Sequence, residues 1–133
     1  MRRLEYSRPI NRTPLHERIM ANLQVRATWI DQATGKTITV EGFTENIGEA
    51  SALVNLNTLP PVGCEVNLRV FNKEKTLIEV PTEVIRVERD PGKPLAALSV
   101  VQNLRSWKQK VLTAAEDWVA HQWRLNYEEE WVN

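Results

Sequence analysis

The feature that most constrains this chain is a series of short segments in which apolar and polar residues alternate. The first segment covers 23–29 and has an apolar residue at every second position: Leu23, Val25, Ala27 and Trp29. Because the side chains of a β-strand point alternately to its two faces, this pattern predicts a strand with one buried face. Further strand-like segments, separated by turn-forming residues, lie at 38–46, 50–56, 65–71, 77–88 and 95–101. Together the six segments predict an antiparallel barrel or sandwich over residues 22–102.

After residue 102 the apolar residues recur at helical spacing instead. One face of the predicted helix collects Trp107, Val111, Ala115 and Trp118. No glycine or proline follows Pro94, so no residue of the breaking types interrupts the helix once it has begun. These observations predict one long amphipathic helix over 103–126, followed by an acidic tail at 127–133 that contains Glu128, Glu129 and Glu130.

A second apolar face runs along the same helix and consists of Leu112, Val119 and Trp123. Two apolar faces on one helix need two surfaces to bury against. We expect one face to pack on the barrel and the other to pack on a second copy of the helix, most simply in a two-fold homodimer.

Composition narrows the classes of function. With 133 residues the chain is long enough for about one domain. Lys+Arg and Asp+Glu both number 17, and this zero balance argues against a nucleic-acid polymer as partner. Cys64 is the only cysteine, and His16 and His121 are the only histidines, so we expect neither a disulfide nor a metal cofactor. The sequence has no apolar run long enough for membrane insertion and no signal-peptide core at its N-terminus, so we expect a cytoplasmic protein.

Residues 1–21 form a basic N-terminal arm. The arm holds five arginines, Arg2, Arg3, Arg8, Arg12 and Arg18. Pro9 and Pro14 disfavour helix within it, so we expect the arm to be extended.

The order of a basic arm, six strands and a C-terminal helix resembles the PilZ domain family. The local resemblance is carried by TVEGFTENIGEASALVNL at 39–56, LPPVGCEVNLRV at 59–70, LIEVPTEVIRVERD at 77–90 and LAALSVV at 95–101. Members of this family are β-barrel receptors for the bacterial second messenger cyclic di-GMP. The resemblance therefore implies an all-β domain with a C-terminal α-helix, in which six antiparallel strands form a PilZ-like β-barrel.

Two motifs carry ligand binding in that family. The first is Arg-x-x-x-Arg in the arm, which Arg8 and Arg12 match; a second register uses Arg18 as the later arginine and has a proline at the earlier position. The second motif is Asp/Asn-x-Ser-x-x-Gly, and here it reads Asn-Ile-Gly-Glu-Ala-Ser at 46–51, with its serine and glycine exchanged. The ligand-binding residues that the resemblance implies are Arg8, Arg12, Arg18, Asn46, Gly48 and Ser51.

These residue types suit cyclic di-GMP, which has two phosphates and two guanine bases. Arginine donates paired hydrogen bonds to a phosphate or to a guanine edge, and it also stacks on a base. Asparagine and serine offer hydrogen bonds to guanine, and glycine permits a close approach of the backbone. A purely structural interpretation of the second motif also stays open, in which the segment is a β-bulge with Gly48 at positive φ and Asn46 capping its own backbone.

Two hypotheses of function follow. In the first, the chain is a non-catalytic signalling module whose arginine arm closes over cyclic di-GMP on the barrel face. In the second, it is a nucleotide-independent adaptor that contacts an unidentified protein partner through its C-terminal helix. The spacing of Arg8 and Arg12 favours the receptor, whereas the exchange of Gly48 and Ser51 favours the adaptor. No nucleophile–base spacing, glycine-rich phosphate loop or paired-carboxylate motif occurs, so we do not expect an enzyme.

Overall fold

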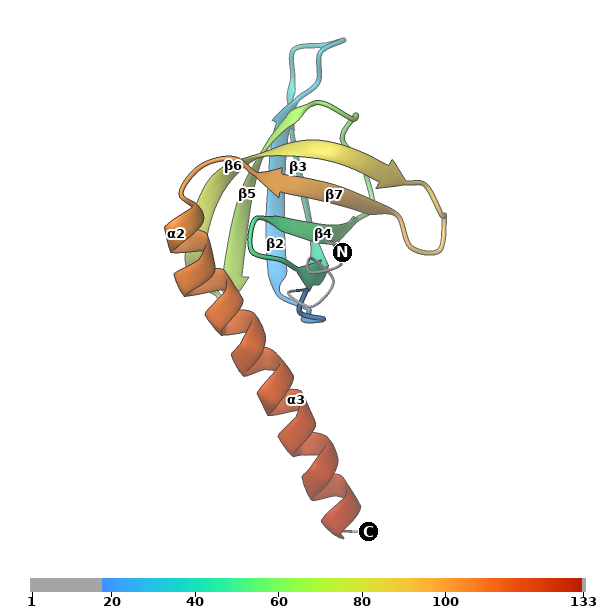
Figure 1. The fold of residues 1–133 in the computed structure, drawn as a ribbon. Coiled ribbons are helices and arrows are strands. Elements are labelled where there is room, and N and C mark those ends of the chain that lie inside the picture. Colours follow the sequence, from blue (N-terminus) through green and yellow to red (C-terminus); the bar gives the residue numbers. More distant parts are fainter. Residues whose placement is uncertain (1–17, 133) are drawn as a thin grey trace, which may run out of the picture.

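The computed structural model describes residues 18–132, and the strands within that range form one closed antiparallel barrel (Figure 1). Around the barrel the strands follow the order β2-β3-β4-β7-β6-β5. Their bounds are β2 Gln24–Ile30, β3 Thr37–Ile47, β4 Ser51–Leu56, β5 Glu65–Asn72, β6 Lys75–Glu88 and β7 Leu95–Val100. The six-stranded antiparallel barrel that the sequence and the family resemblance predicted is therefore confirmed.

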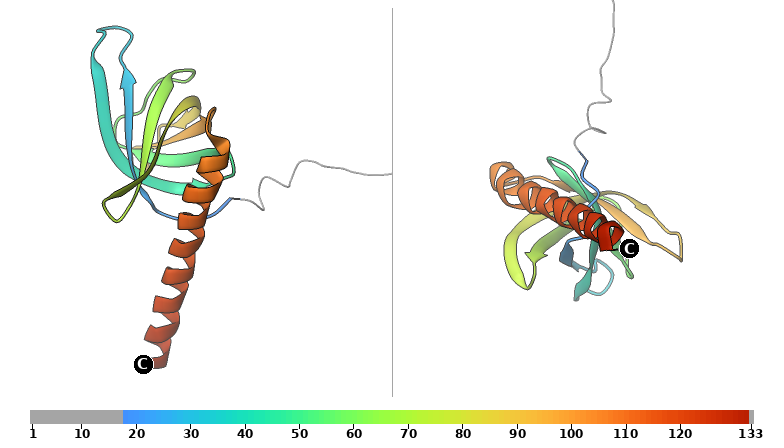
Figure 2. Two further views of the ribbon diagram at one scale, coloured as in Figure 1. Left: turned by 90° about the vertical axis from the view of Figure 1, so that its left-hand side faces the viewer. Right: turned by 90° about the horizontal axis from the view of Figure 1, so that it is seen from below.

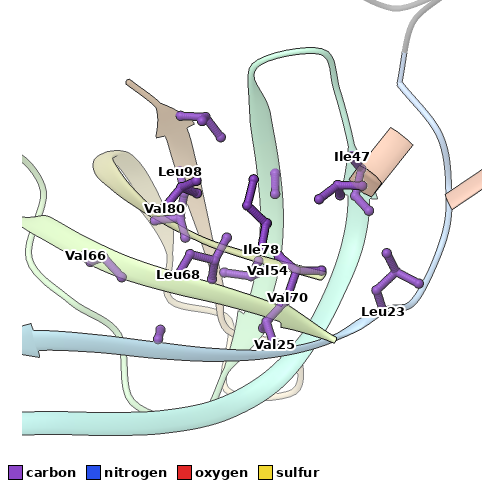
Figure 3. Close-up of a cluster of buried hydrophobic side chains, with 14 of the residues drawn as sticks. Leu23, Val25, Ile47, Val54, Val66, Leu68, Val70, Ile78, Val80 and Leu98 are labelled. Atoms are coloured by element: carbon purple, nitrogen blue, oxygen red, sulfur yellow. The ribbon is translucent and has the colours of Figure 1, made fainter. Parts of the chain in front are cut away.

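The barrel interior is filled by the apolar residues of the alternating segments. Figure 3 shows side chains from several strands pointing into this core, among them Val54, Leu68 and Leu98, which are fully buried. Two buried threonines are satisfied by backbone carbonyls: the Thr44 hydroxyl donates to Ala21 O at 2.5 Å, and the Thr82 hydroxyl donates to Val66 O at 2.8 Å. Both hydroxyl groups that are buried in the described core therefore have partners, as burial of a polar group requires.

Irregularities in the strand pairing lie on the two strands that flank the outer face of β4 and β7. The register shifts between Thr44 and Asn46 on β3, and again between Val84 and Arg86 on β6. An extra residue of this kind bends the strand and changes which side chains point outward. The two shifts place the side chains of Asn46 and Arg86 on the outside of the barrel, opposite outward-facing residues of their neighbours.

A helical segment follows the barrel and leaves it (Figures 1 and 2). It consists of α2 (Leu104–Ser106), a π-helical stretch η2 (Trp107–Leu112) and α3 (Thr113–Val132). Trp107, Val111 and Ala115 are fully buried against the barrel core, so the first predicted face of the helix does pack on the barrel. Beyond Trp118 the helix projects from the barrel. The backbone remains helical to Val132, into the acidic 127–133 segment, because neither glycine nor proline interrupts it.

Replacement of a core leucine provides a test of this packing. We expect Leu68→Ala to lower the free energy of unfolding by about 2–5 kcal/mol, because it leaves a cavity in the barrel core. Val62→Ala is the matched control, since Val62 is 59% exposed and its truncation should change stability by less than about 0.5 kcal/mol. Urea unfolding measures both values, and equal losses for the two variants would contradict the assigned core.

Candidate functional site

The turn between β3 and β4, residues 47–51, is held by segments from three parts of the chain. Ile19 pairs with Ile47 through two backbone hydrogen bonds of 2.7 and 2.9 Å. The Gly48 N–H donates to Ser51 O at 2.8 Å, and the Val100 N–H of β7 donates to Ala50 O at 2.8 Å. The end of the arm, the turn and the end of β7 therefore meet at one point on the barrel.

Arg18 lies over this turn and binds it with its side chain. Its Nε donates to Asn46 Oδ1 at 2.7 Å, and its Nη1 donates to Ser51 Oγ at 2.8 Å. The structure thus brings Arg18, Asn46, Gly48 and Ser51 together. Arg8 and Arg12 lie outside the described residues.

Gly48 is required here for space. A Cβ atom at this position would lie 2.8 Å from Arg18 Nη1 and 3.0 Å from Ser51 Oγ, so the end of the Arg18 side chain would have to move away to admit it. Positive φ angles occur at Gly35 and Gly63 but not at Gly48. The structural interpretation is thus wrong in giving Gly48 a positive φ, whereas the strand irregularity that it expected does occur beside Asn46. The Arg18 guanidinium occupies the place of the missing side chain of Gly48.

A second arginine faces Arg18 across the outer surface of the barrel. Burial lowers the pKa of the Arg18 guanidinium, and the positive charge of Arg86 lowers it further. Arg86 is itself exposed and forms an ion pair with Glu88. Arg86 lies in the 77–90 segment that resembles the family, but neither ligand-binding motif contains it, and only strand pairing brings β6 to this face.

Two apolar residues, Leu53 and Ala97, lie on the barrel surface between Asn46 and Arg86. Asn46 on β3 pairs with Leu53 on β4, and Leu53 pairs in turn with Ala97 on β7. Ala97 then pairs with Arg86 on β6. These paired residues form one row across four neighbouring strands, which begins at Asn46, the residue that binds Arg18, and ends at Arg86.

The inner side of the turn is bound by the base of the helix. The indole Nε1–H of Trp107 donates to Gly48 O at 2.9 Å, and both residues are buried. On the neighbouring residues, Lys108 Nζ lies 3.8 Å from Glu49 Oε1. Helical spacing predicted that Trp107 is buried, but it contained no signal for the hydrogen-bond partner of the indole.

Comparison with solved structures finds PilZ domains. The PilZ domain of CeSA from a cellulose-synthesizing bacterium is 22% identical, with a TM-score of 0.50 over 73% of this chain and 93% of that one. The PilZ domain of YcgR from Escherichia coli, solved with c-di-GMP, is 12% identical, with a TM-score of 0.56 over 79% of this chain and 92% of that one. The Bacillus subtilis inhibitor of motility, MotI/DgrA, is 19% identical, with a TM-score of 0.55 over 81% of this chain but 50% of its own length.

These likenesses show that the chain has a PilZ-like fold, as the resemblance of its sequence predicted. No protein-family model and no curated protein sequence matches the chain. Within residues 18–132 no His, Cys, Asp and Glu side chains form a cluster suited to a metal ion. No helix in that range is long and apolar enough to cross a bilayer.

Substitution of Gly48 tests the position of Arg18. We expect Gly48→Ala to displace the guanidinium from Asn46 and Ser51 and to lower the free energy of unfolding by about 1–3 kcal/mol, the range for losing charged hydrogen bonds. Gly92→Ala is the control, since a Cβ there meets Asp90 Oδ1 at an ordinary 3.5 Å. In an Arg18→Ala background the same Gly48 substitution should cost much less. Additive losses in this double-mutant cycle would contradict the assigned contact.

Proposed function

We propose that this chain is a non-catalytic receptor-type module that binds cyclic di-GMP on the outer face of β3, β4, β7 and β6. The observation that carries the proposal is the arrangement of Arg18, which is fixed by Asn46 and Ser51 and faces the like charge of Arg86. The PilZ-like fold supports it, since the YcgR domain of the same fold was solved with this ligand. Because cyclic di-GMP is an intracellular second messenger, the proposal places the receptor in the cytoplasm.

The electrostatics of the face favour an anion. No carboxylate lies within ion-pair distance of Arg18 in the described part of the chain, whereas Arg26, Arg69 and Arg86 each have one. Two guanidinium groups that repel each other are stabilised by a phosphate between or beside them. Among the described residues Arg86 already has Glu88 as its partner, so one phosphate would bind beside Arg18 and a second phosphate would compete with Glu88 for Arg86.

The shape of the face suits a cyclic dinucleotide. The row from Asn46 to Arg86 crosses three strand spacings, which is about 14 Å. Leu53 and Ala97 are half-buried and lie between the ends of the row, where their apolar side chains offer a surface on which a base could pack. The Asn46 amide and the Ser51 hydroxyl can then form hydrogen bonds to a guanine edge.

The arm supplies the remaining donors in this proposal. Arg12 precedes Arg18 by six residues in the sequence, and a stretch of that length spans at most about 20 Å. Since Arg18 is anchored at one end of the row, Arg12 and then Arg8 can reach across the bound ligand. An arm held against the ligand would form a new surface, and a partner protein that recognises this surface would respond to ligand binding.

Isothermal titration with cyclic di-GMP tests the proposal. We expect binding at micromolar concentration or tighter, weakened at least about tenfold by Arg18→Ala, by Arg86→Ala and by the double variant Arg8→Ala/Arg12→Ala, because each removes charged hydrogen bonds to the ligand. Arg26→Ala is the matched control, since Arg26 lies on β2 and is paired with Glu41 at 3.0 Å. Absence of binding at millimolar ligand, or equal loss in the control, would reject the proposed site.

The projecting part of the helix favours a second function, in which it is a docking surface for another protein. Val119 is 39% exposed, Trp123 is 68% exposed and Leu125 is 43% exposed on α3. A groove of about 620 Å³ runs beside them, with Ile19 and Val119 among its lining residues. Val119 and Trp123 lie one turn apart on the side of α3 that lines this groove, and exposed apolar residues grouped in this way on a projecting helix mark an interaction site.

We take a second copy of the chain as the occupant of this surface. The first turns of the helix carry Arg105, Lys108 and Lys110, whereas Glu128, Glu129 and Glu130 follow near its end. By sequence alone, two such helices in antiparallel orientation would align the basic start of one helix with the acidic end of the other. This is the isologous pairing expected of a homodimer.

Sedimentation equilibrium at tens of micromolar tests this pairing. We expect a mass near twice 15.3 kDa, and a shift toward the monomer mass for Val119→Asp, since a charge in the apolar seam must be desolvated. His121→Asp introduces the same charge at another exposed position of the helix and should leave the dimer intact. A monomer mass for the unsubstituted chain would contradict the pairing.

A further inference from the structure

We infer that Trp107 is a positioning residue of the 47–51 turn and that it couples the outer face of the barrel to the C-terminal helix. The part of this inference that concerns ligand rests on the proposed function. The coupling itself rests on contacts within the described chain. Gly48 stands at its centre, because two different elements contact it from opposite sides.

The outer contact of Gly48 is with the arm. Arg18 Nη1 lies 2.8 Å from the place of its missing Cβ, and the same nitrogen donates to Ser51 Oγ. Ser51 O in turn accepts the Gly48 N–H at 2.8 Å. A movement of the Arg18 guanidinium therefore changes the packing of Gly48 and of its hydrogen-bonded partner in the turn.

The inner contact is with the helix. Gly48 O accepts the indole N–H of Trp107, whose side chain is 0% exposed. A buried N–H that loses its acceptor has no water to replace it, so breaking this bond is costly. If the Gly48 carbonyl reorients, Trp107 must follow it or lose its partner.

Trp107 is also the first residue of η2. The next turn of this stretch buries Val111 in the core, and α3 continues from it without a break. Single π-helical turns often lie at functional positions, because their wider hydrogen bonding tolerates local rearrangement. A shift of Trp107 is thus transmitted to the base of the projecting helix.

A weaker second link runs beside the first. Lys108 and Glu49 approach to 3.8 Å, but their side chains are 51% and 46% exposed, and an ion pair in that setting contributes little. Trp107 is therefore the principal connection. Because coupling between two sites is reciprocal, a ligand that engages Arg18 alters the helix, and loss of the indole hydrogen bond alters affinity for the ligand.

The coupling can be measured first without any ligand. Each tryptophan contributes one indole ¹H–¹⁵N resonance, and the signal of Trp107 is identified by its absence in Trp107→Phe, which retains an aromatic ring. We expect Arg18→Ala to shift the Trp107 resonance and Arg26→Ala to leave it in place. If Arg18→Ala also leaves it in place, the coupling is overturned whatever the result with nucleotide.

The second measurement adds cyclic di-GMP to the full chain. We expect the Trp107 resonance to shift on titration and that of Trp29, buried elsewhere in the barrel, to stay. Trp107→Phe should weaken binding about two- to tenfold, the effect of one hydrogen bond, while Trp118→Phe should not. If the chain binds nucleotide but neither change is seen, the coupling fails and the proposed function stands. If the chain does not bind, the proposed function fails and the ligand-free comparison still decides the coupling.

Discussion

The packing of a guanidinium group against a glycine is the contact on which the outer face depends. Gly48 leaves room for Arg18 to reach both Asn46 and Ser51, and any side chain at that position would occupy the same space. The carbonyl of the same residue accepts the indole hydrogen bond of Trp107 on the inner side of the barrel. One residue without a side chain therefore holds the arm outside and the helix base inside at fixed positions.

The serine and glycine that are exchanged relative to the family motif have distinct structural roles in this chain. In this chain the hydroxyl at Ser51 binds the Arg18 side chain, while the glycine at position 48 makes space for it. The polar group and the small group are both present, at positions that the turn brings next to each other through the bond from Gly48 N–H to Ser51 O. In this turn the exchanged serine and glycine are therefore direct neighbours.

The barrel could be predicted from the sequence because alternation along each strand directly reports which side chains are buried, as it does for Val25, Val54 and Leu98. The grouping of Asn46, Gly48 and Ser51 followed from one local motif. Arg86 could not be predicted, since it reaches the face only through pairing of β6 with β7 and a register shift beside Val84. The hydrogen-bond partner of the Trp107 indole could not be predicted either, because helical spacing indicates which residues are buried but not which groups they bind.

We propose that cyclic di-GMP binds on the barrel face between Arg18 and Arg86. Backbone ¹H–¹⁵N spectra recorded during titration with cyclic di-GMP test it most directly, because they report where on the barrel the ligand acts. If it binds there, we expect the largest shifts at residues 46–51, at Arg86 and at Ala97, with little change on β2 near Arg26. Shifts centred instead on the loop at 57–64, or spread evenly over the barrel, would contradict it.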